Sequence, residues 1–297
     1  MRLRQMLVFF GIARFCGLAL LCAVLMAPAT AVAGQGRVAL VIGNQAYQHL
    51  PRLTTSRKDA QAVADALRRL GFAVTLLTDA SSQAFQHAVT SFAQQARSAE
   101  TVVFYYAGHG VQIDGRNHLL PVTARLDLVS SGTEESWKLD SVVAQLQASN
   151  AQVLLFLDAC RAIPMAGNSG AQAGLAQMQT RAGTFISFAA RPGAVSFDPV
   201  RATGHSLYTA ALLRYVEQPG LSVSDVMIKL RNDVEAASDG QQSPWDQSSL
   251  RAQVYLHPAA ARSTMPSFAV QNSDAATPPQ PEATPNCTFV LVALVCR

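Results

Sequence analysis

The sequence is poor in charged residues. Only 14% of its 297 residues are Asp, Glu, Lys or Arg, whereas 49% are hydrophobic, which excludes an intrinsically disordered chain. No acidic residue precedes Asp59, while Arg2, Arg4 and Arg14 supply three of the positive charges behind the net charge of +4. Loss of these arginines with a leader lowers the net charge to +1, which is too little to indicate binding to nucleic acid or to an anionic surface.

Cysteine is also scarce, and its positions do not suggest a metal site. The five cysteines and six histidines are nowhere clustered at the spacing of zinc ligands, so we expect no metal ion or other cofactor. Calcium dependence stays open. Beyond the leader an odd number of cysteines remains, namely Cys160, Cys287 and Cys296. In an oxidising compartment Cys287 and Cys296 could form a disulfide, which would leave Cys160 as the lone thiol. The sequence does not decide whether this disulfide forms.

The N-terminus has the three parts of a secretory signal peptide. Met1 to Arg4 is basic, Cys16 to Met26 is apolar, and Ala31-Val32-Ala33 is a small-x-small cleavage site. An uncleaved membrane anchor is the alternative, but Arg14 interrupts the apolar run. We therefore predict a signal peptide over residues 1–33, a bacterial export route, and a periplasmic or secreted protein without stable membrane insertion after cleavage.

Predicted strands and helices alternate along the rest of the chain. Continuous apolar strands between amphipathic helices predict an α/β fold, in which a mainly parallel sheet is covered by helices on both faces. The predicted strands span residues 38–43, 73–77, 101–106, 153–157, 184–189 and 253–256, and the predicted helices span residues 60–70, 83–97, 140–148, 206–215 and 224–236. Residues 162–182 read as an exposed loop, and residues 263–297 as a Pro-rich linker or tail.

Two of these strands end in residues that suggest chemistry. The third strand runs into Gly108-His109-Gly110, and the fourth runs into Asp158-Ala159-Cys160-Arg161. If the two strands are neighbours, His109 lies beside Cys160 at the carboxyl edge of the sheet and accepts the thiol proton. The N–H groups of Gly110 and Cys160 then face the oxyanion of a tetrahedral intermediate. The alternatives are a small buried cysteine and a turn histidine with a satisfied ring.

These motifs resemble the caspase-like cysteine peptidases of peptidase family C14, in particular the bacterial metacaspase-like branch. The resemblance rests on "YYAGHG", on "LDACR" and on the separation of 51 positions from His109 to Cys160, a spacing already known for caspases. It continues in "VALVIGN", "DGRNHLLP", "GHSLYTAALLRYV" and "SPWDQSSL", from about Arg37 to His257. It implies a caspase-like three-layer sandwich around a six-stranded, mainly parallel sheet.

The resemblance also implies a substrate preference. Animal caspases carry Gln-Ala-Cys-Arg-Gly and Ser-Trp-Arg, where this chain has Asp158 to Ala162 and Ser196-Phe197-Asp198. Metacaspases place an Asp two residues before the cysteine, as Asp158 stands here, and another at the start of the first helix, as Asp59 stands here. Such an acidic pocket, with Asp198 as a further candidate, implies cleavage after Arg or Lys. Asp59 is alternatively part of a Ser-x-x-Asp helix cap.

The sequence therefore predicts a cysteine-type endopeptidase that acts on polypeptides. The domain spans residues 34–262, with a large-subunit-like part (34–161), a linker (162–182) and a small-subunit-like part (183–262), and Arg181 is the candidate site of self-cleavage. A catalytically weak binding or signalling module and an amidase are the alternatives, and the oligomeric state stays open. Two groups are expected to lie outside the chemistry: Tyr105, Tyr106 and Trp245 as core or cleft wall, and His49, His87, His118, His205 and His257 as bystanders.

Overall fold

The computed structural model describes residues 36–125, 136–148, 150–159, 171–172, 174–194, 196, 204–259, 287–290 and 293–296. The chain divides into two compact units, residues 1–260 and 261–297. The predicted leader, Cys160 and Asp198 lie outside the described residues.

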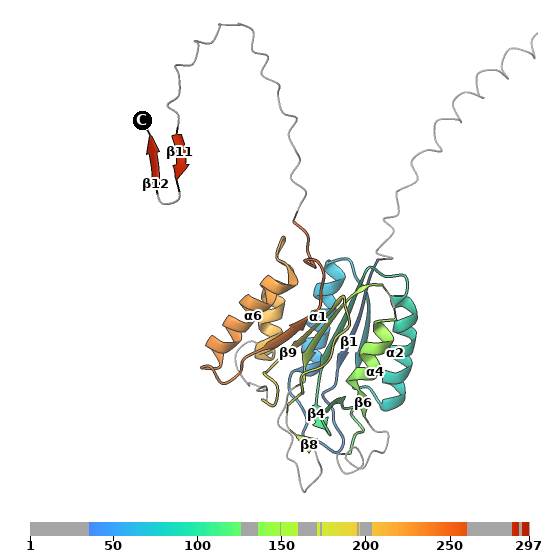
Figure 1. The fold of residues 1–297 in the computed structure, drawn as a ribbon. Helices are drawn as coiled ribbons and strands as arrows, with labels where there is room; N and C mark the ends of the chain where they lie inside the picture. The colour runs from blue at the N-terminus through green and yellow to red at the C-terminus, as the bar shows by residue number, and fades with distance from the viewer. Residues whose placement is uncertain are drawn as a thin grey trace, which may run out of the picture. The chain divides into compact units, whose positions relative to one another are not determined.

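The first unit is built on one six-stranded sheet (Figure 1). Its strand order is β10-β9-β7-β3-β1-β2, and all neighbours are parallel except β10 against β9. The central strands are apolar and buried on both faces, as the sequence predicts for a covered parallel sheet. The strands are β1 (Arg37–Gly43), β2 (Ala73–Thr78), β3 (Thr101–Ala107), β7 (Gln152–Asp158), β9 (Thr184–Phe188) and β10 (Trp245–Ser248).

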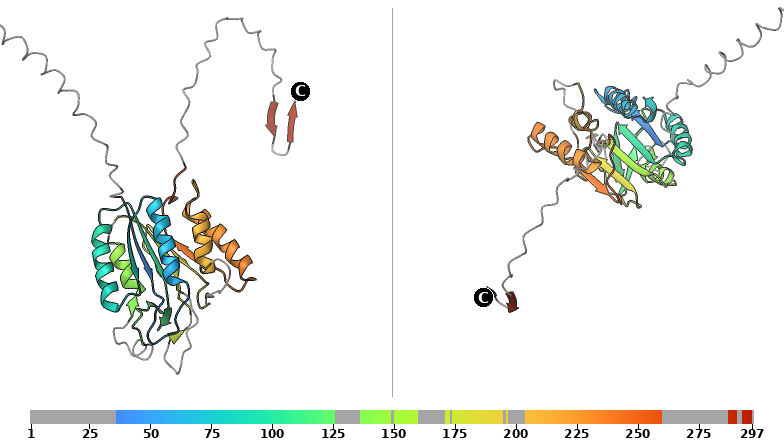
Figure 2. Two further views of the ribbon diagram at one scale, coloured as in Figure 1. Left: turned by 180° about the vertical axis from the view of Figure 1, so that it is seen from behind. Right: turned by 90° about the horizontal axis from the view of Figure 1, so that it is seen from above.

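Helices cover both faces of this sheet, which confirms the predicted three-layer α/β sandwich (Figure 2). One face packs on α2 (Ser82–Ala96) and α4 (Leu139–Leu146), and the other on α1 (Ser56–Arg69), α5 (Leu207–Tyr215) and α6 (Val223–Ala237). Alternate residues of each strand enter the two cores; in β3, for example, Tyr106 joins the α2 side and Tyr105 the α1 side.

A smaller sheet, which the sequence analysis did not anticipate, lies beyond β3. Its order is β6-β5-β4-β8, formed by β4 (Gly110–Ile113), β5 (Arg116–Leu119), β6 (Trp137–Lys138) and β8 (Ala171–Gln172). Asp114 and Gly115 both have positive φ, 48° and 75°, and close the β4–β5 hairpin. Asp-Gly is a common pair for such a two-residue turn, so the "DGRNHLLP" segment did carry a hairpin signal.

Two expectations from the sequence are wrong, and a third is wrong in part. Residues 253–256 form no strand; Val254 and Leu256 pack into the α1-side core, and the sixth strand is the more polar β10. An edge strand pairs through its backbone on one side only, so it needs little hydrophobicity. Trp245 on β10 was expected in the core or in a cleft wall; at 40% exposure it does not belong to the core. The 162–182 segment is no uniformly exposed loop, because Leu175 and Met178 enter the α2-side core.

The second unit contains a β-hairpin within the segment that the sequence analysis assigned to a linker or tail. Strands β11 (Cys287–Val290) and β12 (Ala293–Cys296) pair antiparallel, with Cys287 opposite Cys296 in the register. No helix among the described residues is long and apolar enough to cross a membrane.

Candidate active site

His109 lies between the end of β3 and the start of β4 and is 1% exposed. Its Nε2 lies 2.8 Å from the carbonyl oxygen of Pro51, and its backbone N–H donates to the Tyr47 hydroxyl at 2.7 Å. The Tyr47 ring packs against the imidazole, with the ring centroids 4.4 Å apart. A carbonyl oxygen can only accept a hydrogen bond, so Nε2 carries the proton and the neutral ring has its lone pair on Nδ1.

The two glycines beside His109 are needed for space. A Cβ on Gly108 would stand 2.5 Å from the Tyr106 hydroxyl and 2.7 Å from the Tyr47 hydroxyl. A Cβ on Gly110 would stand 2.8 Å from the carbonyl oxygen of Ala159. The β4 backbone therefore approaches the residue that directly precedes Cys160 more closely than a side chain at position 110 would allow.

Strands β3 and β7 are neighbours, as the predicted dyad requires. They pair in parallel with Ala107 opposite Asp158, and the Gly108 N–H lies 3.2 Å from the Asp158 carbonyl oxygen. His109 follows Ala107 by two residues, and Cys160 follows Asp158 by two residues. Cys160 itself lies outside the described residues, whereas its neighbour Ala159 is fully buried.

The backbone N–H of Gly110 is directed away from β5. Next to the β4–β5 ladder the Leu120 N–H donates to the His109 carbonyl at 3.0 Å, while the His109 N–H donates to Tyr47, so His109 and Leu120 occupy a hydrogen-bonded position of the ladder with one of its two bonds formed. Such pairs alternate with pairs that exchange no bonds, and Gly110 opposite Leu119 is the next one. The Gly110 N–H is thus not used in pairing with β5.

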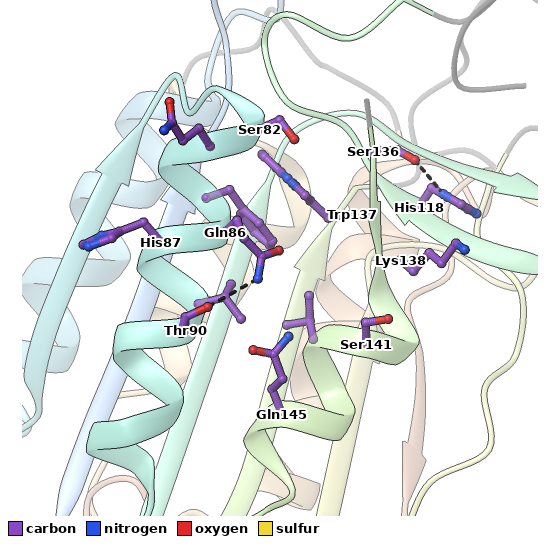
Figure 3. Close-up of a pocket in the computed structure, with 14 residues that line it drawn as sticks. Ser82, Gln86, His87, Thr90, His118, Ser136, Trp137, Lys138, Ser141 and Gln145 are labelled. Atoms are coloured by element: carbon purple, nitrogen blue, oxygen red, sulfur yellow. Dashed lines mark hydrogen bonds between the residues drawn. The ribbon is translucent and has the colours of Figure 1, made fainter. Parts of the chain in front are cut away.

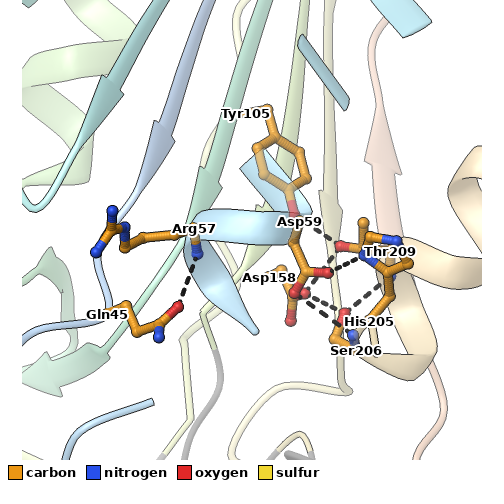
Figure 4. A network of polar contacts seen from close by, with 8 residues as sticks. All are labelled: Gln45, Arg57, Asp59, Tyr105, Asp158, His205, Ser206 and Thr209. Carbon is orange, nitrogen blue, oxygen red and sulfur yellow. Dashed lines mark hydrogen bonds and ion pairs between the residues drawn. The ribbon is translucent and has the colours of Figure 1, made fainter. Parts of the chain in front are cut away.

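Two carboxylates from different elements meet next to this loop (Figure 4). Asp59 of α1 and Asp158 of β7 are both fully buried. Asp59 accepts from His205 Nδ1 at 2.7 Å, and Asp158 accepts from the hydroxyls of Ser206 and Thr209, the latter at 3.0 Å. Burial first, and then the negative charge of Asp158, raise the pKa of Asp59 to about 6, although the contacts with Thr55 and His205 oppose the shift.

The hydroxyl groups of two buried tyrosines contact the His109 loop and the residues that hold Asp158. Tyr106 donates to the His109 carbonyl oxygen at 2.9 Å, and Tyr105 lies 2.6 Å from Thr209 Oγ1. Both tyrosines are fully buried, as predicted, and burial raises the pKa of each phenol well above its usual value. Thr209, a partner of Asp158, is thereby held from a second side.

The two basic residues before Asp59 point in different directions: Arg57 toward Asp79, and Lys58 toward Gly204, the residue that directly precedes His205. Arg57 pairs with Asp79 at 3.5 Å, and Lys58 Nζ lies 2.4 Å from where a Cβ on Gly204 would stand. Helix α1 starts at Ser56 with Thr55 as its N-cap residue, and no side chain caps it, so the predicted Ser-x-x-Asp cap is not formed. Asp59 therefore belongs to the buried acidic pair rather than to a capping box.

His205, Ser206, Tyr47 and Pro51 were missed as site residues. His205 was expected to be a bystander, yet its Nδ1 lies within hydrogen-bond distance of Asp59 Oδ1, at 2.7 Å. The one available signal was the "GHS" preceding a predicted helix, because Ser206 caps α5 and this fixes His205 just before it. Among the described residues no three His, Cys, Asp or Glu side chains are grouped to hold a metal ion.

Comparison with known proteins agrees with this architecture. The family profile for the caspase domain of peptidase family C14 matches residues 36–255, so the chain belongs to the caspase domain family. It is also similar to human mucosa-associated lymphoid tissue lymphoma translocation protein 1, with 34% identity over 88 residues. The mouse homolog matches with the same identity and length. The matched segment spans 30% of this chain and only 11% of either relative.

Proposed function

We propose that this protein is a cysteine endopeptidase in which Cys160 is the nucleophile and His109 the base. The observation that carries the proposal is the fixed imidazole of His109 at the end of β3, in register with a β7 strand that leads into Cys160. The Cα of Cys160 lies about 3.8 Å from that of Ala159 through one peptide bond. Ala159 packs against Gly110, and this close approach directly before Cys160 supports the proposed pairing of the thiol with the histidine.

The proposed chemistry uses the tautomer that Pro51 selects. His109 Nδ1 accepts the thiol proton, and the Pro51 carbonyl stabilises the imidazolium through Nε2–H. The thiolate attacks the peptide carbonyl carbon, and the Gly110 and Cys160 N–H groups bind the oxyanion. The C–N bond then breaks as Nδ1–H protonates the leaving amine. Water, deprotonated by the same nitrogen, attacks the acyl-enzyme and regenerates the thiol. No metal ion takes part in these steps.

The acidic pair supports specificity for Arg or Lys before the cut bond. Asp59 and Asp158 concentrate negative charge beside the proposed nucleophile, and a guanidinium can bind a carboxylate through two parallel hydrogen bonds. A substrate arginine would replace His205 as the partner of Asp59. Asp198 stays a third candidate in this pocket. We also keep the proposal of an exported protein with a leader over residues 1–33.

One observation favours a second candidate function, a catalytically weak caspase-like binding module. Both carboxylates are fully buried, and Asp59 is already paired with His205. A pocket that stays closed in this way would leave the fold as a recognition surface with slow turnover.

Substitution of either dyad residue distinguishes the two candidates. We expect Cys160→Ala and His109→Ala each to abolish cleavage of a fluorogenic peptide with Arg at P1. The double variant should be little worse than either single one, because members of a catalytic unit are not additive. An Arg-directed reactive ketone should modify Cys160, as read by mass spectrometry of the digested protein.

Cys287→Ala is the matched control and should keep wild-type turnover and labelling. Wild-type activity in Cys160→Ala would disprove the dyad. Labelling of Cys160 without peptide turnover would favour the binding module. Faster cleavage after Asp than after Arg would leave the dyad standing and refute the acidic pocket.

A further inference from the structure

The loop between β1 and α1, residues 44–55, carries two partners of His109. The Tyr47 hydroxyl accepts from the His109 backbone N–H at 2.7 Å, and the carbonyl oxygen of Pro51 lies 2.8 Å from the ring Nε2. Pro51 is an exposed residue, so the position of its carbonyl oxygen depends on how this β1–α1 loop is held. Whatever holds the loop therefore also orients the proposed base.

Asp79, which lies between β2 and α2, holds the β1–α1 loop by two hydrogen bonds. Its Oδ1 accepts from the backbone N–H of Gln45 at 2.9 Å and from that of Ala46 at 2.8 Å. Hydrogen bonds to an ionised acceptor are stronger than neutral ones. Two successive N–H groups on one carboxylate oxygen fix the direction of both peptide groups at the start of the loop.

The bond from Ala46 acts on Tyr47, the next residue. The other neighbour of Tyr47 is held as well, because the Gln48 N–H donates to the carbonyl oxygen of Val122 at 2.9 Å. With the chain fixed on both sides, the Tyr47 hydroxyl stays in place to accept from the His109 N–H.

The bond from Gln45 acts on Pro51 across the loop. The Gln45 carbonyl oxygen accepts from the Leu53 N–H at 3.1 Å, so the chain returns to Gln45 two residues after Pro51. The Gln45 side chain also reaches the start of α1, where its Oε1 lies 3.3 Å from the Arg57 backbone nitrogen (Figure 4). The place of the Pro51 carbonyl group, and with it the tautomer of His109, thus depends on where Gln45 is held.

The backbone of Asp79 gives a second, independent observation. Its φ of 50° lies in the left-handed region, which is unfavourable for most residues other than glycine. Such outliers persist where the surrounding structure holds them, and they cluster at functional sites. Ser82, three residues later, lines a groove between α2 and α4 (Figure 3), but Asp79 does not line this groove. Its carboxylate faces the β1–α1 loop instead.

The charge of Asp79 is less important here than its acceptor oxygen. The carboxylate also pairs with Arg57, but at 3.5 Å and with an arginine side chain that is 55% exposed. Exposed ion pairs of this kind contribute little to stability. An uncharged side chain with an acceptor oxygen should therefore be able to replace the carboxylate.

We propose that Asp79 is a positioning residue for catalysis. By holding two successive N–H groups of the β1–α1 loop, it keeps the Tyr47 hydroxyl and the Pro51 carbonyl group where they orient His109. This inference rests on the proposed role of His109 as the base.

Three substitutions separate the acceptor oxygen of Asp79 from its backbone conformation and its charge. Asp79→Ala removes the acceptor and disfavours a positive φ, whereas Asp79→Gly removes the acceptor but adopts a positive φ readily. Asp79→Asn keeps an acceptor oxygen, tolerates this φ and has no charge. We expect the Ala and Gly variants to lower kcat for an Arg peptide by about 10- to 100-fold, as for a base displaced by a fraction of an ångström to 1 Å.

The split between kcat and KM distinguishes positioning from general damage. KM should stay within about twofold in all three variants, because residues of other elements hold the acidic pair. Asp79→Asn should keep kcat within about threefold of the wild type. Asp239→Ala is the matched control, since Asp239 is exposed and also has a φ of 50°, and it should keep wild-type turnover.

Nitrogen-15 NMR of the histidine rings gives a readout that needs no turnover. The wild type should show His109 with its proton on Nε2, and comparison with His109→Gln assigns the signals. Asp79→Gly should show a mixture of the two tautomers, and Asp79→Asn should show the wild-type one. A wild type without peptide turnover would refute the proposed function, whereas the tautomer would still test the role of Asp79.

Several results would overturn the positioning role. They are wild-type kcat or an unchanged tautomer in folded Asp79→Gly, and an equal loss of kcat in Asp79→Asn, because the charge and not the acceptor oxygen would then hold the loop. Failure of Asp79→Gly to fold would overturn it too, since Asp79 would then serve stability. An equal loss in Asp239→Ala would likewise contradict a role specific to Asp79.

Discussion

At the scale of single residues, His109 is positioned by groups far away in the chain. Pro51, 58 residues earlier, accepts from its ring, and Tyr47, 62 residues earlier, accepts from its backbone. Gly110 then fixes how closely this loop approaches Ala159. The atom that would stand nearest to a Cβ at position 110 is a backbone oxygen, which cannot rotate aside as the end of a flexible side chain could.

Gly110→Ala should therefore impair catalysis. The added Cβ would meet the Ala159 carbonyl oxygen at 2.8 Å, so the β4 loop and the end of β7 must separate. A displacement of about 1 Å at a reacting centre lowers the rate by about 100-fold, and we expect that loss in kcat/KM for an Arg peptide. Gly36→Ala is the control, since its Cβ meets only the Glu100 side chain at 3.4 Å. Equal activity of both variants would contradict the tight approach.

The acidic pair is the other feature at the residue scale. Ionised Asp59 is disfavoured by burial and by Asp158, so the folded protein holds its proton up to a pH of about 6, whereas the unfolded chain releases it near 3.8. Between these values the folded state binds more protons than the unfolded state. The free energy of unfolding therefore falls as pH rises through this window.

Asp59→Asn should remove this dependence. At about pH 8 we expect the variant to be more stable than the wild type by on the order of 1–3 kcal/mol, and the difference to shrink as pH falls from about 6 toward 4. The same variant should lose cleavage after Arg, because the pocket loses a charge. Thermal unfolding at both pH values and a peptide assay measure the two effects. A variant that is less stable than the wild type at high pH would show that Asp59 stabilises the fold.

At the scale of elements, the proposed active site and the candidate cleavage site at Arg181 lie at opposite edges of the parallel sheet. His109 and Asp158 lie at the carboxyl edge, whereas Arg181 precedes β9 at the amino edge, where Thr184 pairs with Val153. The five residue-to-residue steps of β7 from Val153 to Asp158 span roughly 16 Å. The Arg181 carbonyl also accepts from the Ser249 hydroxyl, so the bond that follows it is tied to the end of β10.

Cleavage at Arg181 should consequently occur only between molecules. We expect the fragment beginning at Ala182 to appear at a rate that grows with the square of protein concentration. Inactive Cys160→Ala should be cut at this bond by added wild type, and Arg181→Gln should block the cut. N-terminal sequencing over a dilution series gives the measurement. A first-order rate, independent of concentration, would mean that the chain reaches its own Arg181 through a large rearrangement.

At the scale of the whole molecule, one unit contains every described residue of the proposed site. The residues between Tyr47 and Thr209 that hold His109, Asp59 and Asp158 all lie within residues 1–260. The β11–β12 hairpin belongs to the other unit. All described residues that build the proposed site therefore precede position 261.

A chain that ends at residue 260 should fold and cleave like the full-length protein. We expect an unchanged thermal midpoint and a kcat/KM within about twofold, since unfolding of one domain is usually a single cooperative transition. Calorimetry and a peptide assay on both chains measure this. A large loss of activity with an intact midpoint would assign the hairpin unit a part in catalysis.

The sequence by itself determined the α/β class, the central strands and the place of His109 at the end of β3, because continuous apolar runs and flanking glycines are local signals. Through the resemblance to a family, it also predicted that Asp59 and Asp158 lie in one acidic pocket. Only the tertiary structure decided that His205, Ser206 and Thr209 hold these carboxylates and that Pro51 selects the tautomer of His109. Such partners are joined by folding across long stretches of chain, and apart from the "GHS" before α5 no local pattern marks them. The same reason explains the sixth strand: β10 exists because β9 offers it an open edge, not because its own residues are apolar.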